Sequence, residues 1–411
     1  MPTLKLSSVL LLAAGVLAAL LALRAPLGID YAGPPATMCD CAATPIRALA
    51  HARVHDFLAT QPVMGSASLI LRAPFAALGL HFGHGSELDL YRLGTFPCLL
   101  AAGLLGVYLF GRMRELRRPP LACALVAGLV AINPLTSKAL RYGHPEELLG
   151  AALCVAAILA AGRRRPLLAG ILLGAAVATK QWALLAVLPV MAAAAREDRV
   201  RTGAAAAATA ALLIVPMAVG DYHRFIGGNR GAGVVAAGSA MPTNIWFGFG
   251  TDVPVVTDST GHSTAPRVLP ATLGAISHPL ILAVGFGLAM LWWLRRRDAA
   301  PEDALLLFAL IALLRCLLDP MTNSYYHLPF LMSLAAWEGL RRRGAPALTM
   351  GSTLLLASTM ALANSGASLA SLNRFYLAWS LPLAGLLAAL AFAPGRKIGA
   401  RSRQEVLRWA D

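Results

Sequence analysis

The sequence predicts an all-α integral membrane protein, on three observations. Of its 411 residues, 58% are hydrophobic and only 13% are charged, and the mean hydropathy is +0.66. Soluble domains are about 45–50% apolar and roughly a quarter charged. In addition, apolar runs alternate with short clusters of basic residues. This composition excludes a soluble enzyme with a membrane tail, a disordered protein and a disulfide scaffold.

The charge balance supports the same fold class. Lys and Arg number 35 against 20 Asp and Glu, a formal net charge of +15. In a soluble protein this excess would indicate nucleic-acid binding, but basic blocks between apolar runs are typical of cytoplasmic loops. We therefore expect membrane lipids, and no nucleic acid, as partners. The blocks lie at residues 112–118, 163–165, 196–201, 295–297, 341–343 and 396–403.

These blocks predict the number of spans. If all six are cytoplasmic, each interval between neighbours holds an even number of crossings, so five hairpins give ten spans. Leu6–Leu27 and Tyr91–Phe110 add two, for about twelve with both ends inside. Leu6–Leu27 also fits a signal peptide, although we favour an uncleaved helix. Pro62–Leu80 is apolar, and we predict an interfacial helix there, with a full span as the competing interpretation.

One interval is too short for two crossings. Only 30 residues separate Arg165 from Arg196, so two helices of about 14 residues would each rise about 21 Å, short of the roughly 30 Å hydrocarbon core. The turn at Thr179–Trp182 is therefore expected below the outer surface. An ionisable residue at such a depth is functional by default, which singles out Lys180.

Most non-helical sequence falls on the outer side of this single polytopic domain (residues 1–411). Its large pieces are the outer loops 28–90, with interfacial helices, and 220–270, whereas 394–411 is a short basic cytoplasmic tail. A first-loop carboxylate near an apolar wall suits a general base. Asp30, Asp40 and Asp56 are candidates, although a solvated or helix-capping Asp is the commoner role.

Cations on the outer face suit a phosphate group in a low-dielectric cleft. Lys180, Arg141 and Arg315 are the candidates. Arg315 could equally form an i,i+4 ion pair with Asp319. For Arg230, which is surrounded by glycines, we favour a loop residue without a binding role. We predict that further residues line a substrate cleft: Gln61, His144, Glu146, Trp182, Asn244, Trp246 and Tyr326.

Several motifs are absent from the sequence. There is no P-loop, no dinucleotide-binding glycine fingerprint, no metal-spaced Cys/His set and no Gly-x-Ser-x-Gly. We therefore predict no cofactor and no metal.

The order of the motifs resembles the GT-C superfamily of membrane glycosyltransferases, and within it glycosyltransferase family 87, the polyprenyl-phosphate-mannose-dependent mannosyltransferases. A first helix precedes a long outer loop with an early Asp. A segment Ala-Arg-Val-His-Asp-Phe at 52–57 follows, then Gln61–Gly65 and Arg72–Phe75. A glycine-rich helix then ends in Thr179-Lys180. The resemblance covers nearly the whole chain.

This resemblance implies roles for individual residues. Asp40 would be the general base, Lys180 would steady the phosphate leaving group, and His327 would be a second catalytic polar group. Cys39 and Cys41 are departures from the family pattern, and residues 241–246 fit its lipid-facing loop only loosely.

These observations together predict an inverting glycosyltransferase of the cell membrane with a periplasmic or extracellular site. A sugar, most simply mannose, would pass from a polyprenyl monophosphate to a lipid-linked glycan or glycolipid. A multi-spanning transporter or flippase is the alternative. An acyl- or phosphotransferase using the same cleft is a third possibility.

Overall fold

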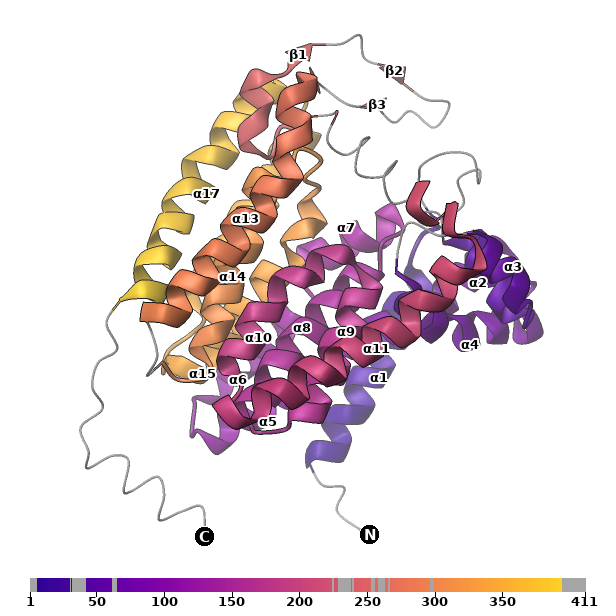
Figure 1. Ribbon diagram of the computed structural model, residues 1–411, viewed down its shortest axis with the longest axis horizontal. Helices are drawn as coiled ribbons and strands as arrows, with labels where there is room; N and C mark the ends of the chain where they lie inside the picture. The colour runs from indigo at the N-terminus through magenta and orange to yellow at the C-terminus, as the bar shows by residue number, and fades with distance from the viewer. Residues whose placement is uncertain are drawn as a thin grey trace.

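The structure, a computed structural model, describes residues 6–29, 31, 42–60, 65–223, 225–227, 238, 240–252, 256–257, 263–264, 267–295 and 299–393. Within these ranges the chain is almost wholly helical (Figure 1). The α-helices are α1 Leu6–Arg24, α2 Ala43–Ala50, α3 Val54–Thr60, α4 Ser66–Phe82, α5 Glu87–Glu115, α6 Pro120–Ala131, α7 Pro134–Tyr142, α8 Glu146–Gly162, α9 Pro166–Thr179, α10 Val187–Ala193, α11 Arg199–Gly220, α13 Ala271–Arg295, α14 Asp303–Leu318, α15 Leu328–Arg341, α16 Ala347–Asn364 and α17 Leu369–Phe392. Short 3-10 helices are η1 Gln181–Ala186, η2 Arg196–Asp198, η3 Ile245–Phe249 and η4 Ser324–His327.

Six helical stretches in the described ranges are long and apolar enough to cross a membrane: Glu87–Glu115, Pro120–Tyr142, Arg196–Gly220, Ala271–Arg295, Ala347–Asn364 and Leu369–Phe392. Their outward faces are apolar; on α11, Leu212 is 74% and Val219 78% exposed. Shorter apolar helices include Ser66–Phe82 and Pro166–Thr179. The chain is thus a multi-pass membrane protein, while the total of twelve spans stays a prediction.

The basic blocks gather at one end of the molecule. Arg118 Nη2 donates to the Leu340 carbonyl at 2.6 Å, and Arg164 pairs with Glu197. Arg112, Arg163 and Arg341 line one small cavity with residues of the α13–α14 connection. The block at 396–403 lies outside the described residues. The contacts agree with the assumption that the described blocks share one side.

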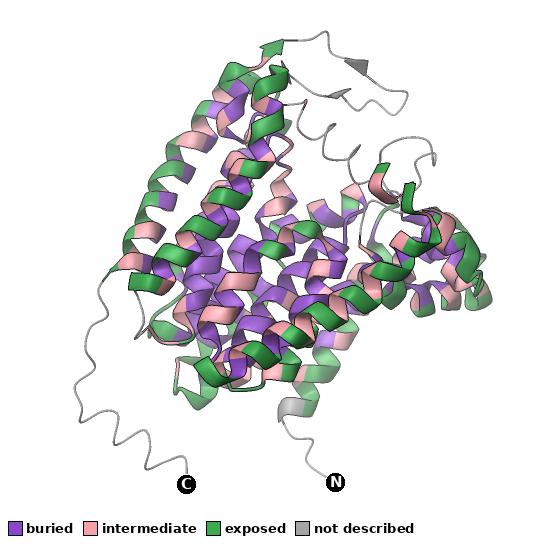
Figure 2. Cartoon of the chain, viewed as in Figure 1, coloured by how far each residue is buried: buried purple, intermediate pink, exposed green. Residues whose placement is uncertain are grey.

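The helices at the centre are short. α8, α9, α14 and α15 have 17, 14, 16 and 14 residues, so each rises only about 21–26 Å. α8, α14 and α15 are buried along almost their whole length (Figure 2). Long, lipid-exposed helices such as α11, α13 and α17 lie around them (Figure 1).

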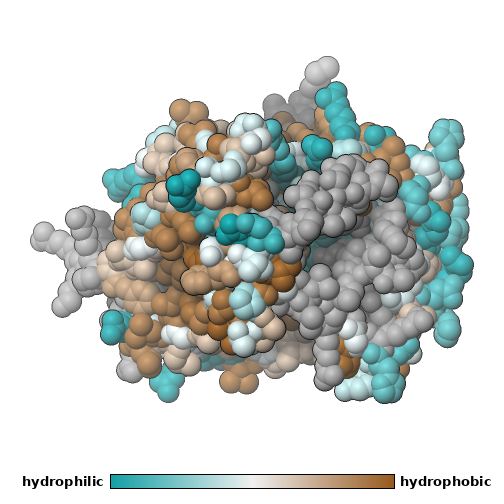
Figure 3. All heavy atoms as spheres, turned by 90° about the horizontal axis from the view of Figure 1, so that it is seen from above, coloured by the Kyte–Doolittle hydropathy of each residue, from teal (hydrophilic) through white to brown (hydrophobic). Residues whose placement is uncertain are grey.

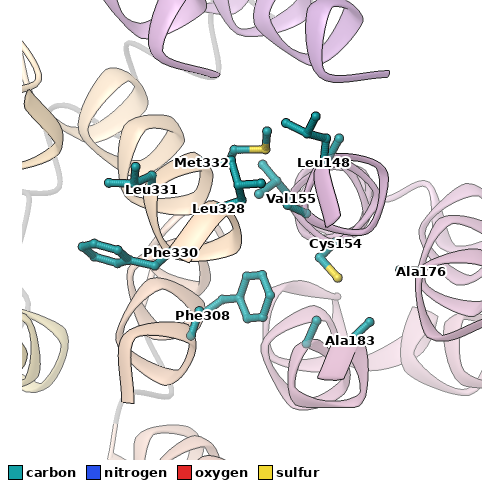
Figure 4. Close-up of a cluster of buried hydrophobic side chains, with 14 of the residues drawn as sticks. Leu148, Cys154, Val155, Ala176, Ala183, Phe308, Leu328, Phe330, Leu331 and Met332 are labelled. Atoms are coloured by element: carbon teal, nitrogen blue, oxygen red, sulfur yellow. The ribbon is translucent and has the colours of Figure 1, made fainter. Parts of the chain in front are cut away.

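Dense apolar packing holds this centre together. Val155 of α8 lies beside Met332 of α15, and Cys154 of α8 lies on the side of Phe308 of α14 (Figure 4); all four side chains are fully buried. α9 and α11 approach closely through small residues, since a Cβ on Gly174 would lie 2.5 Å from the Ala206 carbonyl oxygen. Such contacts are typical of membrane helix pairs.

Two regions differ from the sequence-based expectation. Residues 133–147, expected as a turn, contain the nine-residue helix α7, because Asn133 caps its N-terminus and Gly143, at φ +94°, ends it. The chain is not strictly all-α either. Strand β1 (Thr251–Asp252) pairs antiparallel with β4 (Arg267–Val268), and β2 (Val256–Thr257) pairs likewise with β3 (Ser263–Thr264). Figure 3 views the molecule from above, onto the end that carries β1; hydrophilic residues line the right-hand edge of this view, and smaller groups lie elsewhere.

Candidate active site

A group of buried charged side chains lies where the short central helices end, opposite the basic blocks. We call it the charge cluster, and it comprises Arg72, His144, Glu146, Glu147, Lys180, Arg315 and Asp319. These residues come from α4, the α7–α8 connection, the first turn of α8, the α9–η1 junction and the end of α14. Charges at the ends of buried apolar helices require mutual pairing.

Glu146 is the centre of the charge cluster. Its side chain is fully buried and meets three cationic or potentially cationic groups. His144 donates from Nδ1 at 2.9 Å, Lys180 Nζ lies at 3.2 Å, and Arg72 Nη1 lies at 3.5 Å. Arg72 is itself fully buried and donates from Nε to the Gly94 carbonyl at 3.2 Å.

Glu147 forms the second half of the charge cluster. It accepts a hydrogen bond from Trp182 Nε1 at 2.9 Å, and Lys180 Nζ lies 3.7 Å away. The Arg315 guanidinium lies 5.3 Å from the Trp182 ring centroid and 4.5 Å from that of Tyr326. Lys180 thus bridges both glutamates, and Arg315 stacks between two aromatic rings.

The local sequence explains why these side chains meet. Gly143 ends α7 in the left-handed region, and Pro145 precedes α8, so Glu146 and Glu147 occupy the first turn of α8, where the helix dipole favours anions. α9 stops at Thr179, and Lys180 follows with extended backbone (φ −148°, ψ 135°). The helix end predicted at Thr179 is confirmed. The Lys180 side chain is 12% exposed, and its depth below the outer surface stays a prediction.

The ends of the first loop are held against this region. Ile29 N donates to the Arg141 carbonyl at 3.0 Å, and Ala43 N donates to the Tyr31 carbonyl at 3.1 Å. The Tyr31 ring lies 6.0 Å from the Arg72 guanidinium. The residues that flank 32–41 therefore lie beside the charge cluster.

The start of α4 is fixed to the same place. Gly65 N donates to the Thr179 carbonyl at 3.1 Å, and a Cβ on Gly65 would lie 1.8 Å from the Ala178 carbonyl oxygen. Only glycine permits this approach of two backbones. α4, which carries Arg72, is thereby anchored next to Lys180.

The charge cluster is formally neutral when its histidine is neutral, because Arg72, Lys180 and Arg315 balance Glu146, Glu147 and Asp319. Arg315 Nη2 lies 3.9 Å from Asp319, so the suggested i,i+4 pair exists. Even so, Arg72 Nη2 and Arg315 Nη1 are buried and find no hydrogen-bond partner among the described residues. Buried donors of this kind cost about 1–3 kcal/mol each until an acceptor arrives.

The structure brings together six of the predicted residues: His144, Glu146, Lys180, Trp182, Arg315 and Tyr326. Arg141 instead lies exposed in the last turn of α7. Asp56 is half exposed and pairs with Arg53 at 3.4 Å. Asp30, Asp40, Gln61, Arg230, Cys39 and Cys41 lie outside the described residues.

Two residues predicted to line the cleft, Asn244 and Trp246, form hydrogen bonds that hold the fold together. Asn244 is fully buried; its Oδ1 accepts from Trp246 N and Phe247 N, and its Nδ2 donates to the Pro320 carbonyl at 2.7 Å. Trp246 Nε1 donates to the Leu318 carbonyl at 2.6 Å. These bonds fasten η3 to the end of α14.

His327 is the last residue of η4, and its side chain is fully buried. Its Nδ1 donates to the Ser324 carbonyl at 2.9 Å, and its Nε2 accepts from the Tyr376 hydroxyl at 2.8 Å. Tyr325, in the same turn, stacks on His144 with centroids 5.2 Å apart. His327 therefore contacts α17 and fixes the turn that supplies two aromatic neighbours of the charge cluster.

Sequence reasoning did not name Arg72, Glu147 or Asp319 as site residues. A lone arginine within the apolar stretch Ser66–Phe82 was a usable signal, since ionisable residues in such segments mark functional sites. Among the described residues, no group of three His, Cys, Asp or Glu side chains is arranged to hold a metal ion.

Comparison with known proteins places these observations in a family. The model of glycosyltransferase family 87 matches residues 65–320. That range contains all seven residues of the charge cluster. A comparison with curated protein sequences gives no match.

Two solved structures resemble the fold distantly. The oligosaccharyltransferase AglB from Archaeoglobus fulgidus, in complex with an inhibitory peptide and a dolichol-phosphate, is 14% identical with a TM-score of 0.42; the match covers 97% of this chain and 57% of that one. ArnT from Cupriavidus metallidurans, bound to undecaprenyl phosphate, is 14% identical with a TM-score of 0.37, over 93% and 77% of the two chains. The chain thus spans little more than half the length of AglB.

Proposed function

Because this chain belongs to glycosyltransferase family 87, we propose that it is an inverting glycosyltransferase that moves mannose from a polyprenyl monophosphate to a lipid-linked glycan or glycolipid. The acceptor hydroxyl oxygen attacks the sugar C1, and the bond from C1 to the phosphate oxygen breaks. The hydroxyl proton passes to a carboxylate, and polyprenyl phosphate leaves.

The observation that carries this proposal is a buried set of cations at the ends of helices too short to cross a membrane. Arg315 Nη1 and Arg72 Nη2 are unused donors, and a phosphate oxygen is a strong acceptor for a guanidinium. Lys180 is held by Glu146 and Glu147, so its charge is positioned and partly neutralised. Arg315 then contacts the phosphate, and Lys180 supports the leaving group beside it.

Asp40 is the proposed general base. It belongs to the segment whose flanking residues, Tyr31 and Ala42–Ala43, lie beside Arg72 and are joined by a backbone hydrogen bond. A chain of ten residues between these fixed ends has the reach to place a carboxylate near the charge cluster. His327 contributes as a positioning residue, because it fixes η4 through Ser324 and Tyr376.

The distribution of charge supports the proposed orientation of the site. The described basic blocks lie at the end opposite the charge cluster, and basic loops are preferentially cytoplasmic. We propose on this ground that the site faces the periplasmic or extracellular side. A lipid-tethered donor reaches it by lateral diffusion, without a nucleotide-binding site.

The test is transfer of labelled mannose from polyprenyl phosphate mannose to endogenous lipids, in membranes that contain the wild type or a variant. Asp40→Asn should lower transfer by about 10²–10⁴-fold, the usual contribution of a general base. Asp56→Asn is the matched control, because Asp56 is half exposed and paired only at the surface; it should retain wild-type transfer.

Other results would change the assignment. Wild-type transfer with Asp40→Asn, but loss with Asp30→Asn, would move the base to Asp30. Absence of transfer by the wild type from every polyprenyl phosphate sugar would refute the reaction class and favour the transporter interpretation.

A further inference from the structure

A second cavity lies at the basic end of the molecule, opposite the end that carries the charge cluster. Its volume is about 520 Å³, and it is lined by Ala192, Arg196, Arg199, Trp292, Trp293, Leu294 and Ala299. These residues come from the end of α10, from η2 and the start of α11, from the last turn of α13, and from the connection to α14. Its volume falls within the range of small-molecule sites.

Two arginines give this cavity a positive charge. Arg199 donates from Nε to the Met191 carbonyl at 3.1 Å, and its guanidinium lies 4.2 Å from the Trp293 ring centroid. These two contacts fix the guanidinium plane at the cavity wall. Arg196, three residues earlier, is exposed. In the described part of the chain, neither arginine forms an ion pair.

The nearest carboxylates along the chain are bound elsewhere. Glu197 pairs with Arg164, and Asp198 Oδ2 lies 3.8 Å from Arg164 Nε. Arg164 belongs to the connection between α8 and α9, so it holds both carboxylates in ion pairs of their own. Among the described residues, no carboxylate neutralises Arg196 or Arg199, so their positive charge suits a bound anion.

The surroundings of the cavity are those of a membrane interface. Leu294 is 56% and Met290 49% exposed on α13, and Val200 is 80% exposed on α11. Trp292 is anchored, since its Nε1 donates to the Ala391 carbonyl at 3.0 Å. Tryptophans next to arginines, with apolar side chains beyond them, are typical of the headgroup region.

We propose that this cavity binds the headgroup of an anionic phospholipid from the leaflet at the basic end, with the acyl chains along the exposed apolar face of α13. The phosphate accepts from Arg196 and Arg199, and the glycerol region packs against Trp293. Basic pockets between membrane helices bind lipid headgroups in this manner. A free phosphate ion offers the same charge but leaves the apolar wall of Trp293 and Leu294 unused.

The test uses the purified, delipidated full-length protein in detergent. Dioleoylphosphatidylglycerol, dioleoylphosphatidylcholine and inorganic phosphate are titrated separately, and the thermal unfolding midpoint is followed. Only the anionic lipid should raise the midpoint of the wild type. In R196Q/R199Q the half-saturating concentration should rise about thirtyfold, since each basic residue at an anionic surface contributes about fivefold.

The matched control is R114Q/R117Q, which removes the same charge at the same end but lines neither cavity; its half-saturation should stay within about twofold of the wild type. If R196Q/R199Q does not fold, R196Q alone should shift half-saturation about fivefold, because Arg196 is exposed. The proposal is overturned if the arginine variants titrate like the wild type, if phosphatidylcholine binds as well, or if inorganic phosphate alone reproduces the effect.

Discussion

Replacing either partner of the Arg72–Glu146 pair tests the electrostatic account of the charge cluster, because the two partners are not equivalent. Arg72 has one charged neighbour, Glu146 at 3.5 Å, and one nitrogen that already lacks a partner. Glu146 has Lys180 at 3.2 Å and His144 at 2.9 Å in addition. Glu146→Gln therefore leaves a buried guanidinium without a counter-charge, whereas Arg72→Met leaves Glu146 paired.

The magnitudes follow from this asymmetry. An uncompensated buried charge costs about 3–5 kcal/mol, which is the expected loss for Glu146→Gln. Arg72→Met removes one ion pair and the bond to the Gly94 carbonyl, for about 1–3 kcal/mol. The double variant should lose less than the sum of the two, because it removes the isolated cation that the first replacement creates.

The measurement is the free energy of unfolding in mixed micelles, from an SDS titration followed by tryptophan fluorescence, for the wild type, both single variants and the double variant. An equal loss for the two single variants, or strict additivity in the double variant, would refute the reasoning. Lys138→Met, at a partly exposed position of α7 away from the charge cluster, should change stability by less than about 0.5 kcal/mol.

Two further substitutions probe the framework of the site. Gly65→Ala places a Cβ 1.8 Å from the Ala178 carbonyl oxygen, so we expect misfolding or a loss above about 3 kcal/mol, measured as the folded yield; Gly15→Ala, with open space around it, should express like the wild type. Trp182→Phe keeps an aromatic ring beside Arg315 but removes the indole N–H that donates to the Glu147 carboxylate at 2.9 Å. This loss should lower the free energy of unfolding by about 1–3 kcal/mol in the same SDS titration. An unchanged stability would show that this bond is not formed.

The parts of the fold that could be predicted depend on local sequence. The basic blocks mark helix ends, and the short interval before Arg196 indicated the stop at Thr179. Glu146 and Trp182 were predicted because they lie near such helix ends. The length of a helix and the position of a charge within it can be read from a stretch of a few tens of residues, without knowledge of distant contacts.

The contacts that escaped prediction are long-range. Arg72 meets Glu146 across 74 positions, and Asn244 donates to Pro320 across 76. The sequence around Asn244 does not indicate that its amide donates to the carbonyl of Pro320, so this structural bond could not be predicted. The helix α7 was missed for a different reason, since its Asn133-Pro134 start and Gly143 end also fit a turn.

The length difference between central and outer helices has a consequence for the enzyme's response to its bilayer. Lipid meets long helices such as α11, α13 and α17, whose lengths match a full hydrocarbon core. The shorter α8, α14 and α15 are covered by protein, so their mismatch with the bilayer is not relieved by thinning it. The distance of the charge cluster from the ends of the long helices is therefore set by packing within the protein, and we expect it to be the same in thin and thick membranes.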